Sequence, residues 1–224
     1  MNTSEGGSQS KWYVRLWRWL WRPSAGISLA TLLILGFFAG IIFWGGFHWA
    51  VELSNTESFC ISCHEMRDTP YQELQKTVHF VNRTGIRAIC SDCHVPREWV
   101  HKIGRKIIAT KDLFFHVLGK IDTPEKYEEH RLGMALTVWT SMKNSNSREC
   151  RNCHENVWMD ISAQWGGAQR NHEIAMKNGL TCIDCHQGIA HTLPEGFVRP
   201  SAEQLVENAR QWLENMEALE AAQN

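Results

Sequence analysis

Three features are missing from this sequence of 224 residues, and each absence excludes a class of protein. No cysteine stands outside one repeated motif, so none is left for a structural disulfide or a catalytic nucleophile. No segment alternates apolar and polar residues convincingly, so we expect no strands. Charge of one sign is not in excess, because the formal net charge is −1, and this balance argues against a nucleic-acid partner.

Charge is nevertheless distributed unevenly along the chain. Residues 1–24 form a basic, tryptophan-rich segment in which four basic residues stand against Glu5. Residues 201–224 have the opposite character and predict an acidic amphipathic helix, which we expect to be a solvated tail. The two ends of the chain are therefore expected to lie in different surroundings.

Residues 25–47 contain no charged side chain. In a helix these 23 residues span roughly 34 Å, enough to cross the hydrocarbon core of a bilayer. The run is too long for the apolar region of a cleaved signal peptide, and no clear cleavage site stands before Glu52, so we expect an uncleaved single-pass anchor. Because basic residues and tryptophans precede it, we expect a bacterial cytoplasmic membrane protein with its N-terminus in the cytoplasm and the rest in the periplasm.

All eight cysteines fall into four copies of the motif Cys-x-x-Cys-His. Two thiols three positions apart lie on neighbouring positions of a helical turn, where they can add to the two vinyl groups at one edge of a porphyrin. The histidine that follows is placed to bind the iron, so the motif predicts c-type haem attachment. Zinc sites and disulfides are the alternatives, but neither explains a histidine after every pair. We predict four covalent haems, held by Cys60, Cys63 and His64; Cys90, Cys93 and His94; Cys150, Cys153 and His154; and Cys182, Cys185 and His186.

The four motifs lie within residues 52–200, which we expect to form a periplasmic haem domain. The order motif, histidine, motif occurs twice and predicts two dihaem units at about residues 55–95 and 148–194. So short a segment around four haems leaves little room for an ordinary core, so we expect the macrocycles to supply most of it.

The linker between the two units carries the clearest helical signals. Apolar spacing predicts a helix over residues 98–118, and Asp122-Thr123-Pro124-Glu125 predicts the cap and first turn of another. The expected fold class is mainly α with much irregular structure: one N-terminal transmembrane helix, then a haem-cored multihaem cytochrome c domain made of two dihaem repeats.

Seven histidines lie outside the motifs and are candidates for the second axial ligand of each iron. His79 and His172 hold matching places in the repeat, and His191 closely follows the fourth motif, so we predict these three as distal ligands. The other four are expected at the membrane interface (His48) or at the surface and around the haems (His101, His116 and His130). An iron with two histidine ligands has no open position for substrate, so these haems favour electron transfer over chemistry.

Three distal histidines for four irons leave one iron different. Met66 follows the first motif, and no other copy has methionine at that place. Spacing leaves open whether Met66 binds the iron of haem 1 or packs against the ring edge. An iron near the membrane with a weak ligand is where a quinol would deliver electrons.

The motifs and the sequence around them resemble the NapC/NirT family of membrane-bound tetrahaem cytochromes c, which includes the NrfH-type subunits. The likeness runs from about Arg15 to Pro194 through RLWRWLWRPS, IIFWGGF, ESFCISCHEMRDTPYQE, CSDCHVP, IDTPEKYEEHRL, SRECRNCH and CIDCHQGIAH. It implies a quinol dehydrogenase that takes electrons from the membrane pool of menaquinol or ubiquinol. It also implies a periplasmic reductase, or its dihaem cytochrome subunit, as the acceptor. Nitrate reductase is the nearest match, and nitrite or trimethylamine N-oxide reductases are alternatives.

For the site, the resemblance implies His79, His172 and His191 as distal ligands and Met66 as a ligand of haem 1, with the role of His64 there left open. It places Asp112 at the other face of haem 1 and Lys106 in the quinol pocket, with Lys111 as the second choice. Since relatives dimerise or join their partner, a homodimer is also left open.

Three other functions compete with this one. A passive electron wire has no quinol site and is reduced by another membrane protein. A catalytic reductase of nitrite or hydroxylamine needs a five-coordinate haem open to the periplasm. A haem-delivery protein has to release haem, which covalent attachment at every motif opposes.

Overall fold

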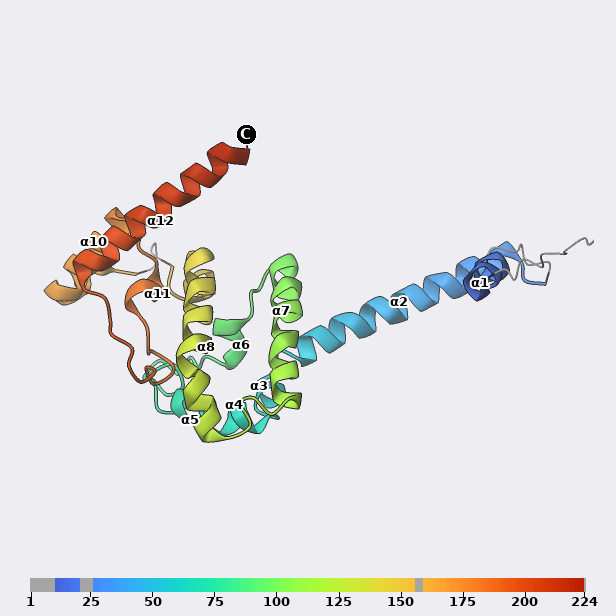
Figure 1. Ribbon diagram of the computed structural model, residues 1–224, viewed down its shortest axis with the longest axis horizontal. Helices are drawn as coiled ribbons and strands as arrows, with labels where there is room; N and C mark the ends of the chain where they lie inside the picture. Colours follow the sequence, from blue (N-terminus) through green and yellow to red (C-terminus); the bar gives the residue numbers. More distant parts are fainter. Residues whose placement is uncertain (1–10, 21–25, 156–158, 224) are drawn as a thin grey trace, which may run out of the picture. The chain divides into compact units, whose positions relative to one another are not determined.

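The computed structural model describes residues 11–20, 26–155 and 159–223, and within these ranges it contains helices and irregular segments but no strand (Figure 1). The expected fold class, mainly α with much irregular structure, is confirmed. The chain divides into two compact units, Met1–Glu52 and Leu53–Asn224. Most of the basic segment predicted over residues 1–24 lies outside the described residues.

The first unit contains α1 (Trp12–Leu20) and α2 (Leu29–Leu53). Helix α2 has a mean hydropathy of 2.1, and none of its most apolar window is buried against the protein, as suits a helix whose surroundings are lipid. It ends at Leu53, later than the predicted 47, because a helix does not have to stop at the edge of the bilayer. It begins at Leu29, where the Ser28 hydroxyl accepts a hydrogen bond from the Thr31 amide at 3.2 Å.

The second unit is built from short elements, some of which carry the motifs, and from four longer helices. Because an aspartate occupies the third position of the second and fourth motifs, it can cap the first turn of its own helix. Asp92 accepts a hydrogen bond from the Ile89 amide at 2.9 Å, and Asp184 accepts one from the Thr181 amide at 2.8 Å. The short elements are α3 (Glu57–Cys60), α4 (His64–Asp68), α5 (Pro70–Leu74), α6 (Cys90–His94), α9 (Arg148–Arg151), the 3-10 helix η2 (Ile161–Ala163) and α11 (Cys182–Cys185).

The longer helices agree with the sequence signals. Helix α7 (Trp99–Val117) ends just before Gly119, whose φ of +61° terminates it. Helix α8 (Pro124–Asn144) starts where predicted, with the Thr123 hydroxyl accepting a hydrogen bond from the Lys126 amide at 3.4 Å. The other two are α10 (Gly166–Lys177) and α12 (Ala202–Gln223), the second of which confirms the helix predicted near the C-terminus.

The apolar core of the second unit is very small. Its buried hydrophobic side chains within the described ranges are Leu74, Ile121, Ile183 and Ala209. Many large apolar side chains of the same unit remain exposed, as expected if the protein packs around large cofactors and not only against itself.

Candidate functional site

The four cysteine motifs approach one another in pairs. The thiols of Cys60 and Cys90, from the first and second motifs, are hydrogen-bonded to each other, and this bond lowers the pKa of Cys60 to about 7. The thiols of Cys150 and Cys182, from the third and fourth motifs, form the same contact, which lowers the pKa of Cys182 to about 6. Haem edges attached at these positions therefore lie side by side within each pair of motifs.

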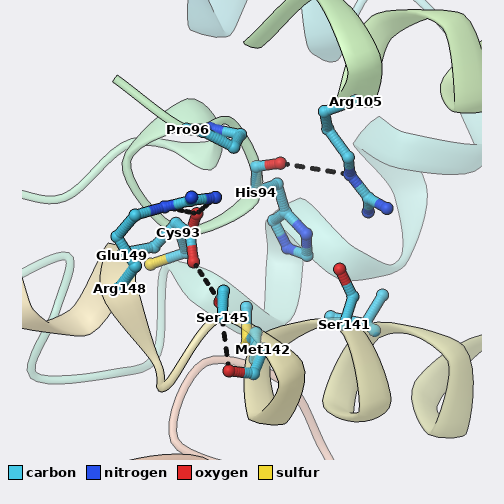
Figure 2. Close-up of a pocket in the computed structure, with 10 residues that line it drawn as sticks. Cys93, His94, Pro96, Arg105, Ser141, Met142, Ser145, Arg148 and Glu149 are labelled. Atoms are coloured by element: carbon cyan, nitrogen blue, oxygen red, sulfur yellow. Dashed lines mark hydrogen bonds and ion pairs between the residues drawn. The ribbon is translucent and has the colours of Figure 1, made fainter. Parts of the chain in front are cut away.

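The second and third motifs join the two pairs. Helices α6 and α9 contact each other, and Cys93 lies close enough to Cys153 for their charges to interact. A cavity opens beside Cys93 and His94, between α6, α7, α8 and α9, and Figure 2 shows the Arg105 Nε donating to the backbone oxygen of His94 at 3.3 Å. The motifs thus follow one another in space in the order one, two, three, four.

Histidines from distant parts of the chain face each other in four pairs. The ring centroids are 6.2 Å apart for His79 and His154, 6.2 Å for His94 and His191, and 5.9 Å for His172 and His186. In each of these three pairs one ring belongs to a motif and the other is a predicted distal ligand. The fourth pair is His64 and His116, at 6.0 Å.

These distances fit an iron held between two imidazoles. Two metal–nitrogen bonds of about 2 Å each leave the two ring centres about 6 Å apart. A ligand imidazole must also be neutral. Loss of water lowers the pKa of His94 to about 4 and lowers the pKa of His186 and His191 as well. Nδ1 of His172 is hydrogen-bonded to the Gln164 side-chain oxygen at 2.6 Å, which leaves its Nε2 for a metal, as is usual for a ligating histidine.

The pair at the first motif is arranged differently. Nε2 of His64 lies 3.0 Å from the backbone oxygen of Asp122, and its Nδ1 lies 3.2 Å from a carboxylate oxygen of Glu65. The second Glu65 oxygen lies 2.5 Å from Nδ1 of His116. Burial raises the pKa of Glu65, but the His116 hydrogen bond, a backbone hydrogen bond and the charges of His64 and His116 together outweigh it and hold the pKa below its ordinary value. Nε2 of His64 is hydrogen-bonded and its Nδ1 faces a carboxylate, so this motif differs from the other three.

Met66 lies on α4, two residues after His64, and is half-buried. Since Nε2 of His64 is hydrogen-bonded to a backbone oxygen and its Nδ1 faces the Glu65 carboxylate, the methionine is a candidate ligand at this motif. The set Cys63, Glu65 and His116 brings three potential metal-ligating atoms within 4.8 Å, but Cys63 is committed to thioether attachment.

Lys106 and Asp112 are not brought together. Six positions separate them on α7, which turns their side chains about 120° apart around the helix axis. Lys106 Nζ donates to the Ser54 hydroxyl at 2.7 Å. Asp112 instead shares a face with Arg105 and His116, where loss of water raises the pKa of its carboxyl despite the nearby Arg105 charge. Lys111, the second choice for the pocket, lies 5.1 Å from the centre of the Phe115 ring.

Two groups around the motifs were not found by sequence reasoning. His116 was expected at the surface or around the haems, and its contact with Glu65 was not predicted; only its one-turn spacing from Asp112 hints at a shared face. Glu73 and Arg131 form an ion pair at 2.7 Å beside the segment of His191, and their positions in the sequence give no sign of this contact.

The remaining histidines belong to none of the four facing pairs: His101 and His130 are exposed, and His48 lies near the end of α2.

Known proteins resemble this chain over most of its length, including all four motifs. Residues 22–196 match the NapC/NirT cytochrome c family, N-terminal region. The cytochrome c-type protein NapC of Escherichia coli (strain K12) is 56% identical over 81% of this chain and 90% of that protein. The denitrification system component NirT of Stutzerimonas stutzeri is 54% identical over 79% of this chain and 88% of that protein. The NapC protein of Paracoccus pantotrophus is 53% identical over 80% and 76%. No solved structure matches the chain. With its four haem-attachment motifs inside the matched residues, this chain belongs to the NapC/NirT family of cytochromes c.

Proposed function

We propose that this protein oxidises membrane quinol and passes the electrons along four haems to a periplasmic reductase system, with nitrate reductase as the first candidate. The observation that carries the proposal is the continuous order of the four motifs in space, with three motifs built alike and the first one different. The names of the relatives, cytochrome c-type protein NapC and denitrification system component NirT, agree with a role in nitrogen-oxide respiration.

The anchor helix supports one orientation of the chain in the membrane. Helix α2 is the one described helix that is long and apolar enough to cross a bilayer. With the basic segment on the cytoplasmic side, the unit that carries the haems lies in the periplasm. We divide that region into the haem domain over residues 52–200, with dihaem units at 55–95 and 148–194, and the acidic tail.

The histidine pairs support an assignment of axial ligands. His79 serves the iron of the third motif, His191 that of the second, and His172 that of the fourth. At the first motif Met66 would hold the iron in place of His64, whose Nε2 is hydrogen-bonded to a backbone oxygen. Bound haems would supply one-electron carriage, and two histidines would hold the iron at each of the second, third and fourth motifs so that no substrate can bind there.

A ligand substitution tests this assignment. His79→Ala should give one high-spin haem at the third motif, because the chain then offers a single imidazole there, while four haems remain covalently bound. The measurement is the ratio of high-spin to low-spin haem by electron paramagnetic resonance. His130→Ala is the control, because the His130 ring bonds only to the Lys126 carbonyl of its own helix at 3.0 Å. An unchanged spectrum in His79→Ala would remove His79 from the ligand set.

Quinol oxidation must dispose of two electrons and two protons for each quinol. Bound haems would accept the electrons one at a time, and the protons would leave to carboxylates or water. Asp112, whose pKa is raised by loss of water, accepts a proton as the carboxylate and releases it to solvent. Lys106, an ammonium tied to Ser54, holds the quinol oxygen where negative charge develops.

The direct test uses the purified holoprotein in lipid vesicles with a quinol analogue as the sole reductant. Reduction of the haems supports quinol oxidation, whereas haems that stay oxidised with quinol and reduce with dithionite would identify a passive wire.

Asp112→Asn should slow this reaction by about 10²-fold without loss of haem, because the amide cannot accept a proton. Since only the carboxylate is active, the native rate should rise as the pH rises through the raised pKa of Asp112, and the variant should lose that rise. The control is Asp160→Asn, since Asp160 caps η2 and asparagine caps equally well. An undiminished rate in Asp112→Asn would exclude the residue from the reaction.

A further inference from the structure

Helix α7 has two unlike faces. Its inner face holds the rest of the unit: Arg105 donates to the backbone oxygen of His94, Lys106 donates to Ser54, and His116 meets Glu65. The opposite face carries an apolar row that we call the outer stripe. The outer stripe consists of Val100, Ile107, Phe114 and Leu118, which are between 64% and 77% exposed.

The haems do not account for the outer stripe. The groups that would surround haems 1 and 2 lie on the inner side of α7, where Cys60 is near Lys106, and His116 is within reach of Cys63. A row of large apolar side chains that points away from both the protein and its cofactors marks an interaction surface.

The position of α7 along the chain indicates which surface covers the stripe. Helix α2 contains 25 residues and is about 37 Å long, so its last turns reach beyond a hydrocarbon core of about 30 Å. Ser54 follows the last residue of that helix. Because Lys106 bonds to Ser54 at 2.7 Å, the middle of α7 is tied to the point where the chain leaves the bilayer.

The charge of the segment indicates the kind of lipid. Between residues 99 and 120 the chain has several lysines and Arg105 but only one acidic residue, Asp112. Lys111 and Lys120 hold their ammonium groups 5.1 Å and 4.8 Å from the centre of the Phe115 ring, an arrangement in which the charged ends can reach headgroups above an apolar layer. A second copy of this chain would instead bring like charges together across the stripe.

We propose that α7 is an interfacial helix: its outer stripe enters the headgroup region of the bilayer, and its lysines bind anionic phospholipid. An apolar stripe bordered by lysines is the pattern by which helices lie in a membrane surface. The inference concerns the docking of the haem domain on lipid and holds whether or not quinol is the electron donor.

Photocrosslinking of the full-length holoprotein tests this proposal. The protein is placed in vesicles of phosphatidylglycerol and phosphatidylcholine that contain a phospholipid with a diazirine near its headgroup, and mass spectrometry maps the adducts. We expect adducts on residues 99–118 as well as 29–53, and at least severalfold fewer on α8. Replacement of phosphatidylglycerol by phosphatidylcholine should lower the α7 yield severalfold and leave the α2 yield unchanged.

The matched variants are Ile107→Glu with Phe114→Glu on the outer stripe and Leu136→Glu on α8, each checked for four haems. The stripe variant should lose the α7 adducts, and Leu136→Glu, at a position 48% exposed, should keep them. Adducts confined to α2, or α7 adducts that persist unchanged in the stripe variant, would overturn the proposal.

Discussion

Protein made without haem attachment is expected to lack a stable fold over residues 53–223. The second unit buries only four apolar side chains within its described residues, while ordering each residue of the backbone costs about 1–2 kcal/mol. Covalent haems would supply the missing apolar surface, and those at the second, third and fourth motifs would also join segments through a further histidine, as His94 and His191 illustrate.

The measurement is helix content and amide hydrogen exchange of full-length protein in detergent, with and without haem attachment. Helix α2 should remain helical and protected in both forms because its backbone hydrogen bonds are internal and detergent replaces the lipid. Amides of α7 and α8 should exchange rapidly in the haem-free form. Native helix content with slow exchange in those two helices would show that the polypeptide folds on its own.

Arg131→Met is expected to destabilise the holoprotein by about 3–5 kcal/mol. Arg131 is nearly buried, donates to both carboxylate oxygens of Glu73 at 2.7 Å and donates to the Thr192 carbonyl at 2.6 Å. Glu73 in turn accepts the Thr192 amide at 3.1 Å and lies 3.7 Å from Nδ1 of His191. Without Arg131 a buried carboxylate has no cation, and the segment that carries His191 loses an anchor.

Denaturant unfolding gives the stability, and the spin state of the haem at the second motif reports on His191. The matched control is Arg210→Met, because the ion pair of Arg210 with Glu207 at 2.9 Å is more than half exposed and contributes about 0–1 kcal/mol. A second variant, Arg131→Met with Glu73→Gln, should recover part of the loss since no buried charge remains unpaired. Equal stability of Arg131→Met and the control would contradict the role of this ion pair.

Local signals predicted the elements and the attachment sites. The spacing of Cys-x-x-Cys-His identifies the attachment sites because a thioether pair and its iron ligand must lie within one turn of chain. Caps at Thr123 and a stop at Gly119 set the bounds of α7 and α8 for the same reason: each depends on residues a few positions away. The anchor was predicted from composition, although its end at Leu53 was not, since a helix can continue past the bilayer.

Spacing failed where partners come from opposite halves of the chain. His79 lies in the sequence of the first dihaem unit, and spacing left its partner open; its ring faces His154 of the second unit, and His191 returns to face His94. The same is true of Glu73 and Arg131, which meet only when α5, α8 and the segment of His191 pack together.

Motif chemistry in this sequence is sufficient to specify the number of haems, their covalent points of attachment, and the presence of a membrane anchor, because each depends on atoms held within one turn or one helix. Which histidine completes which iron, why the first motif differs, and which face of α7 remains uncovered are outcomes of packing between distant segments. The physical reason is that bonds within a helical turn are set by residue spacing, whereas contacts between remote segments exist only once the chain has closed around its haems.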